Sequence, residues 1–171
     1  YPTNDEGRAY YLGQLHFLDR EIGELLQELE DQGLSDNTVI LFVSDNGGSL
    51  VTYANNGNLK GGKYTLFEGG TRVPMIISYP GMVQTNVVSD ATVSAMDLFP
   101  TICTLTGTPV PDGLDGMDIS PLLSGQKKSI GPRTLFWDTK AENSVRSGKW
   151  KLLTTKKPPN PRLQIEKTPK G

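Results

Sequence analysis

Apolar side chains recur every three or four positions in the first part of the chain, which is the spacing of one helix face. Asn4 and Asp5 are candidate N-caps before this stripe, and Gly33 is a candidate C-terminal stop after it. The pattern predicts one long helix that packs on a sheet. His16 lies beside the stripe, so we expect it to pack rather than to catalyse. The stripe consists of Leu12, Leu15, Leu18, Ile22, Leu25, Leu26 and Leu29.

The pattern then changes to a short, continuous apolar run. Residues 39–44 read Val-Ile-Leu-Phe-Val-Ser, and Asp45, Asn46 and two glycines follow directly. Short β-branched and aromatic runs are typical of strands that are covered on both faces in a parallel sheet. Ligands of such sheets bind beyond the carboxyl ends of the strands. Asp45 and Asn46 are therefore predicted to stand at a ligand site.

The chemistry of this pair suits a hard cation. A carboxylate beside a carboxamide offers two hard oxygen donors, as Mg²⁺ or Ca²⁺ requires. The same Asp-Asn-Gly sequence is also a common turn signal, because Asn and Gly tolerate positive φ. The residues Asp45 and Asn46 alone leave both interpretations open.

A long segment rich in glycine and asparagine follows, over residues 47–70, and it contains Lys63 directly after Gly61-Gly62. Loops of this length in compact domains are usually functional or mobile. The missing side chains would let the lysine approach a bound anion closely. A solvated surface lysine is the alternative. A P-loop is excluded, because Tyr64 stands where that motif needs Ser or Thr.

The second half of the chain predicts shorter elements. A strand over 73–79 precedes a short helix over 94–107, in which Cys103 is expected to be a buried structural thiol. Two antiparallel strands are predicted over 134–137 and 144–154, with Trp137 and Trp150 as core anchors.

Taken together, these segments resemble the type I sulfatase family of the alkaline-phosphatase-like superfamily. Each motif alone is weak evidence, but their order and spacing fit from about residue 10 to 153. The motifs that carry the resemblance are Thr38-Val-Ile-Leu-Phe-Val-Ser-Asp-Asn-Gly47, Leu59-Lys-Gly-Gly-Lys63, Phe67-Glu-Gly-Gly-Thr-Arg-Val-Pro74, Tyr79-Pro-Gly81, Val88-Ser-Asp90, Val93-Ser-Ala-Met-Asp-Leu-Phe-Pro-Thr-Ile102, Leu114-Asp-Gly-Met117, Pro121-Leu-Leu-Ser-Gly125 and Val145-Arg-Ser-Gly-Lys-Trp-Lys-Leu152.

The resemblance implies an α/β fold, as part of an alkaline-phosphatase-like sandwich with a mostly parallel sheet and helices on its faces. Residues 1–125 would belong to this domain, 126–155 to a small antiparallel C-terminal subdomain, and 156–171 to a poorly ordered basic tail. It also implies hydrolysis of a sulfate ester on a small molecule or glycan. Asp45 and Asn46 match the family's metal ligands, and Lys63 matches its sulfate-binding catalytic lysine. One divalent cation is expected, Ca²⁺ in preference to Mg²⁺.

Several parts of the family's site have no match in this sequence. The formylglycine nucleophile arises from Cys or Ser in a Cys/Ser-x-Pro/Ala-x-Arg motif, and Cys103 does not stand in one. The family's first aspartate pair and its active-site histidines also lack counterparts. We therefore expect a C-terminal portion of a longer sulfatase, with formylglycine in the missing N-terminal part and no activity of this chain alone. The resemblance suggests a periplasmic, secreted or lysosomal location.

Charge is unevenly distributed over the 171 residues. Residues 1–126 hold 5 basic and 16 acidic side chains, a formal charge of −11, and residues 127–171 hold 12 and 3, a formal charge of +9. We interpret the basic end as a solvated subdomain and expect no nucleic-acid partner. No apolar run is long enough to span a membrane. A phosphodiesterase or phosphonate hydrolase of the same superfamily, and a non-catalytic glycan- or partner-binding remnant, are the alternative functions.

Overall fold

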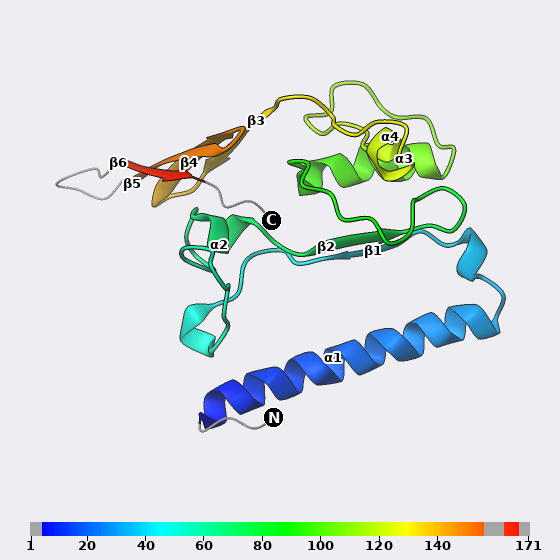
Figure 1. Cartoon of the computed structure of the whole chain (residues 1–171), viewed down its shortest axis with the longest axis horizontal. Coiled ribbons are helices and arrows are strands. Elements are labelled where there is room, and N and C mark those ends of the chain that lie inside the picture. Colours follow the sequence, from blue (N-terminus) through cyan, green and yellow to red (C-terminus); the bar gives the residue numbers. More distant parts are fainter. Residues whose placement is uncertain (1–4, 156–162, 168–171) are drawn as a thin grey trace.

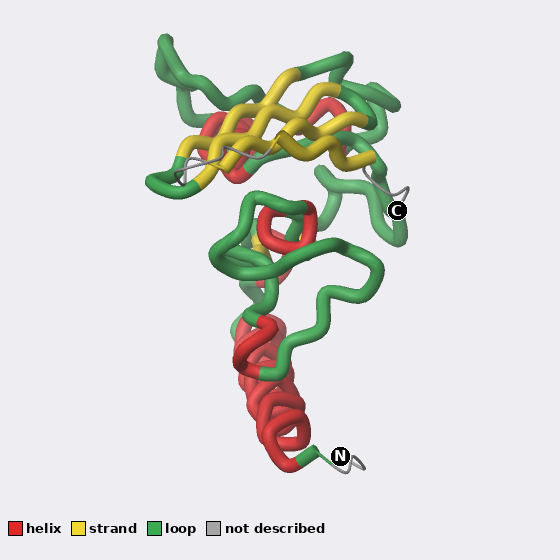
Figure 2. Tube along the Cα trace, turned by 90° about the vertical axis from the view of Figure 1, so that its left-hand side faces the viewer, coloured by secondary structure: helices red, strands yellow, loops and turns green. Residues whose placement is uncertain are grey.

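The computed structural model describes residues 5–155 and 163–167. Figures 1 and 2 show the long helix α1 at one end of the molecule, a two-stranded sheet in the middle and a four-stranded sheet at the other end. The elements are α1 (Glu6–Asp31), η1 (Ser35–Asn37), β1 (Ile40–Val43), η2 (Leu50–Thr52), α2 (Glu68–Thr71), β2 (Met75–Ser78), η3 (Ala95–Asp97), α3 (Leu98–Leu105), α4 (Ser120–Leu123), β3 (Thr134–Asp138), β4 (Glu142–Ser147), β5 (Trp150–Thr155) and β6 (Leu163–Lys167).

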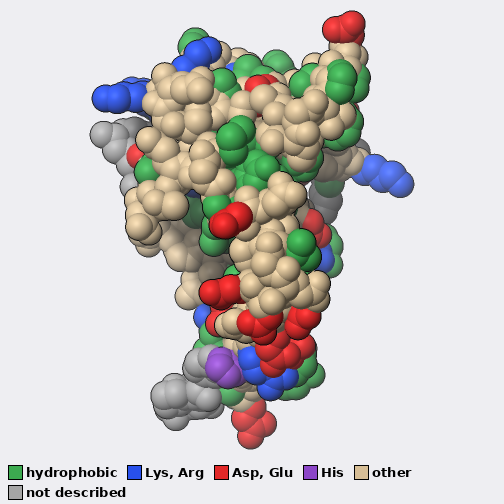
Figure 3. All heavy atoms as spheres, turned by 90° about the vertical axis from the view of Figure 1, so that its right-hand side faces the viewer, with side chains coloured by type: hydrophobic (Ala, Val, Ile, Leu, Met, Phe, Trp, Pro, Cys, Tyr) green, Lys and Arg blue, Asp and Glu red, His purple; other side chains and the backbone are tan. Residues whose placement is uncertain are grey.

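The bounds of α1 follow the signals in its sequence. The Asp5 carboxylate accepts a hydrogen bond from the Arg8 backbone nitrogen, which makes Asp5 the N-cap, and Gly33 adopts a φ of +67° after the last turn. Asn4 lies outside the described residues. Acidic side chains gather over α1 in the lower part of the face shown in Figure 3. Within the described structure no helix is long and apolar enough to cross a membrane.

The expected burial of α1 is wrong for this structure, because none of its residues is buried by the described part of the chain. Leu15, Leu18 and Leu25 are 45%, 49% and 60% exposed, and His16 is exposed as well. Figure 1 shows α1 running below the β1–β2 sheet. The apolar stripe is present in the sequence, but the surface that would cover it is not among the described elements.

Strands β1 and β2 pair antiparallel, with Val43 opposite Met75 and Ile40 opposite Ser78. The prediction of a parallel, doubly covered strand is therefore wrong for this pair, and Phe42 and Val43 are each about two-fifths exposed. The reason is the connection, because residues 44–74 leave and re-enter the sheet at the same end. A parallel neighbour would need a crossover to the opposite end. Asp45 and Asn46 still follow the carboxyl end of β1, as expected.

Helix α3 is anchored by one buried aspartate. Asp97 completes the capping box of η3, the turn that leads into α3, with Ser94; it also accepts a hydrogen bond from the Met117 backbone nitrogen (3.0 Å) and forms an ion pair with Arg133, just before β3. Cys103 is a free, buried thiol on this helix, which confirms the prediction for it. The capping aspartate thus joins α3 to the chain that enters the second sheet.

The second sheet is a meander in the order β3-β4-β5-β6, and all its neighbours are antiparallel. The single strand predicted over 144–154 is wrong, because a turn with Gly148 at a φ of +54° divides it into β4 and β5. Residues 156–171 were predicted to be a poorly ordered basic tail, but they contain the strand β6. Its sequence, Leu-Gln-Ile-Glu-Lys, alternates apolar and polar residues. The rest of that tail lies outside the described residues.

Alternation along the strands decides which side chains of this sheet are buried. Lys151 and Leu153 point to the covered face, whereas Trp150 and Leu152 point to the other face and are 51% and 37% exposed. The prediction of Trp150 as a core anchor is therefore wrong. Trp137 is half-buried, and the Lys151 ammonium lies 4.6 Å from the centre of its ring.

Candidate functional site

The turn after β1 is held by local hydrogen bonds. The Ser44 hydroxyl donates to the Asn46 carbonyl (2.8 Å), and Asn46 Nδ2 donates to the Gly47 carbonyl (3.0 Å). Asn46 is half-buried and Asp45 is exposed. Because the amide nitrogen of Asn46 faces a carbonyl, its Oδ1 lies on the other branch of the amide. The turn therefore presents a carboxylate and an amide oxygen from consecutive residues.

Three backbone hydrogen bonds bring the loop that carries Lys63 to this turn. The Lys63 nitrogen donates to the Gly48 carbonyl (3.1 Å), the Gly47 nitrogen to the Gly70 carbonyl (2.9 Å) and the Gly69 nitrogen to the Lys60 carbonyl (2.7 Å). The three bonds join residues 45–48, residues 60–63 and α2 into one cluster. The bonded residues are 15, 23 and 9 positions apart in sequence, so separate parts of the loop are placed side by side.

Glycines make this close approach possible. A Cβ added to Gly47 would lie 1.7 Å from the Gly69 carbonyl oxygen, and one added to Gly62 would lie 2.4 Å from the Gly48 oxygen. A Cβ on Gly70 would lie 2.1 Å from the Thr65 oxygen. Backbone oxygens cannot yield as a flexible side chain can, so these positions exclude every other residue type unless the backbone moves.

The Lys63 side chain is exposed beside a strained neighbour. Tyr64 adopts a φ of +76° and is 83% exposed, and the Lys63 ammonium lies 5.5 Å from the centre of its ring. A non-glycine residue in this region costs roughly 1–2 kcal/mol. The ammonium group is accessible to an anion from solvent.

Glu68 attaches the cluster to the four-stranded sheet, through partners that sequence reasoning did not identify. Its carboxylate is 1% exposed and pairs with Lys151 (3.2 Å), which is 0% exposed, and with Arg146 (3.5 Å). Lys151 also donates to the Thr71 hydroxyl (2.5 Å). The four-stranded sheet is therefore joined to α2 by a buried ion pair. A sequence signal existed, because a lone acid between Phe67 and Gly69-Gly70 is unusual in a buried segment.

Asn56 is a second residue of the cluster that sequence reasoning missed. Its side-chain amide binds the backbone of Gly48 and of Gly61, so it contacts both the turn and the lysine loop. The sequence offered little signal, because Asn55, Asn56 and Asn58 look alike in a polar loop.

The donor set fits a divalent cation in part. Mg²⁺ takes six ligands and Ca²⁺ about six to eight, all of them oxygens. Asp45 and Asn46 supply two such oxygen groups, and no cluster of three or more His, Cys, Asp or Glu side chains occurs in the parts of the chain that the structure describes. These two residues can hold one side of a cation, and its remaining ligands would come from elsewhere.

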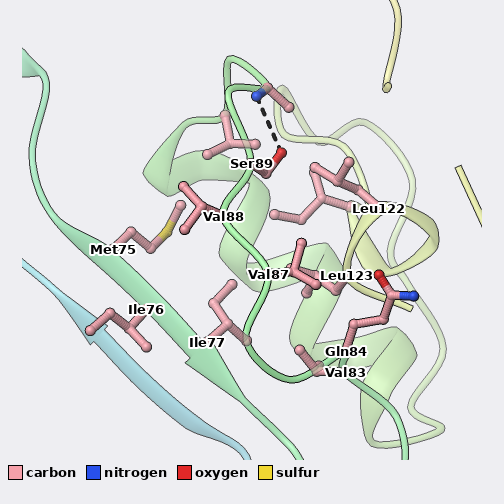
Figure 4. A pocket seen from close by; sticks show the side chains of 13 residues that line it. Met75, Ile76, Ile77, Val83, Gln84, Val87, Val88, Ser89, Leu122 and Leu123 are labelled. Atoms are coloured by element: carbon pink, nitrogen blue, oxygen red, sulfur yellow. Dashed lines mark hydrogen bonds between the residues drawn. The ribbon is translucent and has the colours of Figure 1, made fainter. Parts of the chain in front are cut away.

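A hollow of about 330 Å³ lies elsewhere, between β2, the segment 83–93 and α4. Figure 4 shows Met75, Ile77, Val88 and Leu122 around it. None of Asp45, Asn46 and Lys63 lines this hollow, and no charged side chain does. Its apolar lining suits packing rather than the recognition of an anionic ester.

Two protein-family models match this chain, and together they cover most of its length. Residues 1–108 match the family model described as Sulfatase, and residues 62–157 match the one described as N-sulphoglucosamine sulphohydrolase, C-terminal. Human arylsulfatase A is 35% identical over 154 residues, which covers 85% of this chain and 30% of that protein. The chain thus spans about 30% of the length of this curated relative.

Solved structures give the same result at the level of the fold. Ps i-CgsB in complex with k-i-k-neocarrahexaose aligns with a TM-score of 0.81 and 34% identity, over 95% of this chain and 37% of that one. Phosphonate monoester hydrolase SpPMH from Silicibacter pomeroyi aligns with a TM-score of 0.72 and 24% identity, over 91% and 34%. The second similarity shows the fold alone. Together they confirm the fold class predicted from the sequence, of which this chain forms a part.

Proposed function

The chain belongs to the sulfatase family, and from this membership we propose that it contributes part of the metal and sulfate site of a sulfate-ester hydrolase. The observation that carries the proposal is the hydrogen bond from the Lys63 nitrogen to the Gly48 carbonyl (3.1 Å). It joins the lysine loop to the turn that bears Asp45 and Asn46. An ammonium group, and a cation held by two oxygen ligands on the adjoining backbone segment, can bind a single anionic group.

Each of the three side chains has a separate role in the proposal. Asp45 and Asn46 hold one divalent cation, and Asn46 coordinates without adding negative charge, so the site stays attractive to an anion. A bound cation would polarise the sulfate group. Ca²⁺ is proposed in preference to Mg²⁺, because it accepts a larger and less regular set of oxygens. Lys63 contacts the sulfate oxygens and neutralises the charge that develops as the S–O bond breaks.

The nucleophile is proposed to lie outside these 171 residues. Cys103 is buried on α3, where it packs as a small apolar group, and the sequence around it lacks the formylglycine motif. We propose that a formylglycine in another part of the same protein would supply the nucleophile, as a hydroxyl group of its hydrate. The purified chain alone is accordingly expected to be inactive. The substrate is proposed to be a sulfated small molecule or glycan, with the organic group recognised by loops around the site.

A lysine exchange in the full-length protein tests the proposal. Lys63→Ala should lower the turnover of an aryl sulfate by roughly 10²–10³-fold, because one preorganised charge at the reacting group is lost. Lys60→Met is the matched control, because it removes another ammonium group of the same loop, one that lies over the Phe67 ring (4.1 Å). The rate of this variant should stay near that of the parent protein. Parent activity with a phosphonate monoester and none with a sulfate ester would favour the alternative hydrolase. A normal sulfatase rate in Lys63→Ala would remove Lys63 from the site.

A further inference from the structure

The side chain of Asn56 spans two parts of the candidate site. Its Nδ2 donates to the Gly48 carbonyl and to the Gly61 carbonyl, both at 3.0 Å, and its Oδ1 accepts from the Gly48 nitrogen (2.9 Å). A carboxamide has two donor hydrogens and an acceptor oxygen. All three hydrogen bonds of the side chain therefore join it to backbone groups, and Asn56 is half-buried.

The two backbone positions that Asn56 binds flank the proposed functional residues. Gly48 follows Asn46 by two residues, and Gly61 precedes Lys63 by two. The Gly48 carbonyl also accepts the Lys63 nitrogen (3.1 Å), so the amide and the lysine backbone meet at the same oxygen. A displacement of Asn56 would thus act on the lysine loop and on the metal-ligand turn at once.

The amide is closely surrounded, and its donors and acceptor favour asparagine over its substitutes. A Cβ on Gly62 would lie 2.8 Å from Asn56 Nδ2, and a Cβ on Gly48 would lie 2.9 Å from Oδ1, so the amide occupies the room that those side chains would need. Aspartate has the same size but lacks both donors, and it would set a carboxylate oxygen against two carbonyl oxygens. Alanine would remove the amide donor from both carbonyls.

We propose that Asn56 is a positioning residue, which holds the Lys63 loop against the Asp45–Asn46 turn so that the ammonium and the cation reach one sulfate group. The proposal rests on the proposed function of these three residues. Asn56 itself contacts backbone and acts on the substrate only through Lys63 and the turn. Misplacement of a charged group by about 1 Å can lower a rate by roughly 10²-fold.

A double-mutant cycle in the full-length protein separates positioning from general stability. Asn56→Ala should lower kcat/KM for a sulfate ester by roughly 10- to 100-fold in the parent, and should have little further effect in the Lys63→Ala background. Asn56→Asp, which preserves the volume, should behave like Asn56→Ala. Asn58→Ala is the matched control, because Asn58 is an exposed residue of the same loop, and it should leave the rate unchanged.

Amide hydrogen exchange gives a readout that does not depend on activity. Asn56→Ala should accelerate exchange in the segment 59–66, which contains the Lys63 amide, and Asn58→Ala should not. Equal losses of activity in the parent and the Lys63→Ala background, or unchanged exchange in that segment, would overturn the positioning role. A parent protein that cleaves no sulfate ester would refute the proposed function alone, while the exchange measurement would still decide on Asn56.

Discussion

Gly47 of the candidate site and two glycines further along α1, Gly13 and Gly23, stand in opposite surroundings. A Cβ on Gly47 would lie 1.7 Å from a backbone oxygen, whereas a Cβ on Gly13 or Gly23 of α1 would have no atom within 4 Å. The site is a loop region with little regular structure, and yet its backbone segments are in direct contact. Helix α1 is fully regular, and no residue of it is buried in the described structure. Regular secondary structure and tight packing are thus separate properties in this chain.

The difference reflects the range of the interactions that define each region. Helix α1 is specified by near neighbours in sequence, such as the Asp5 cap and the stripe of leucines. The site loops are specified by contacts between distant residues, such as Glu68 with Lys151 and Gly47 with Gly70. We therefore expect substitutions to have large effects in the site region and small or favourable effects in α1, when all are measured in the full-length protein.

The largest effect is expected where the buried ion pair is broken. Lys151→Met leaves the Glu68 carboxylate buried without its main partner, and should lower the free energy of unfolding by about 3–5 kcal/mol. Urea denaturation measures this change. Glu68→Gln combined with Lys151→Met removes both charges and should recover much of the loss. Lys149→Met, at an exposed neighbouring lysine, is the control. A Lys151→Met protein as stable as the parent would show that the ion pair contributes little.

A smaller loss of stability is expected at the glycine contact. Gly47→Ala forces the turn away from the Gly69 carbonyl, and overpacking of this kind costs about 1–3 kcal/mol or more. Because the turn bears Asp45 and Asn46, affinity for the divalent cation should fall in the same variant. Thermal melting and a calcium titration measure the two effects. Unchanged cation affinity in a folded Gly47→Ala protein would separate this contact from the metal-ligand turn.

The smallest effect is expected in α1, and with the opposite sign. Gly13→Ala adds a methyl group where nothing lies within 4 Å, and alanine is favoured over glycine inside a helix by about 0.5–1 kcal/mol. The melting temperature should rise slightly. A marked loss of stability would instead mean that another part of the full-length protein packs closely on α1 at Gly13.

Local signals in the sequence were sufficient for some elements and failed for others. The bounds of α1 and the buried thiol of Cys103 were predicted, because each depends on a few adjacent residues. The strand over 144–154 was predicted as one element, although a turn at a single glycine, Gly148, divides it in the structure. Trp150 was predicted as a core anchor, but its register puts it on the exposed face.

For the candidate site, the sequence alone identified the chemical groups of Asp45, Asn46 and Lys63. Their residue types, and their positions after a strand or after glycines, can be read directly along the chain. Their roles stay proposals. Only the tertiary structure revealed Asn56, and only it paired Glu68 with Lys151 across 83 residues. The physical reason is that the ability to bind a cation or an anion belongs to a single side chain. A hydrogen bond or a buried ion pair between distant residues exists only after the backbone has brought both partners together.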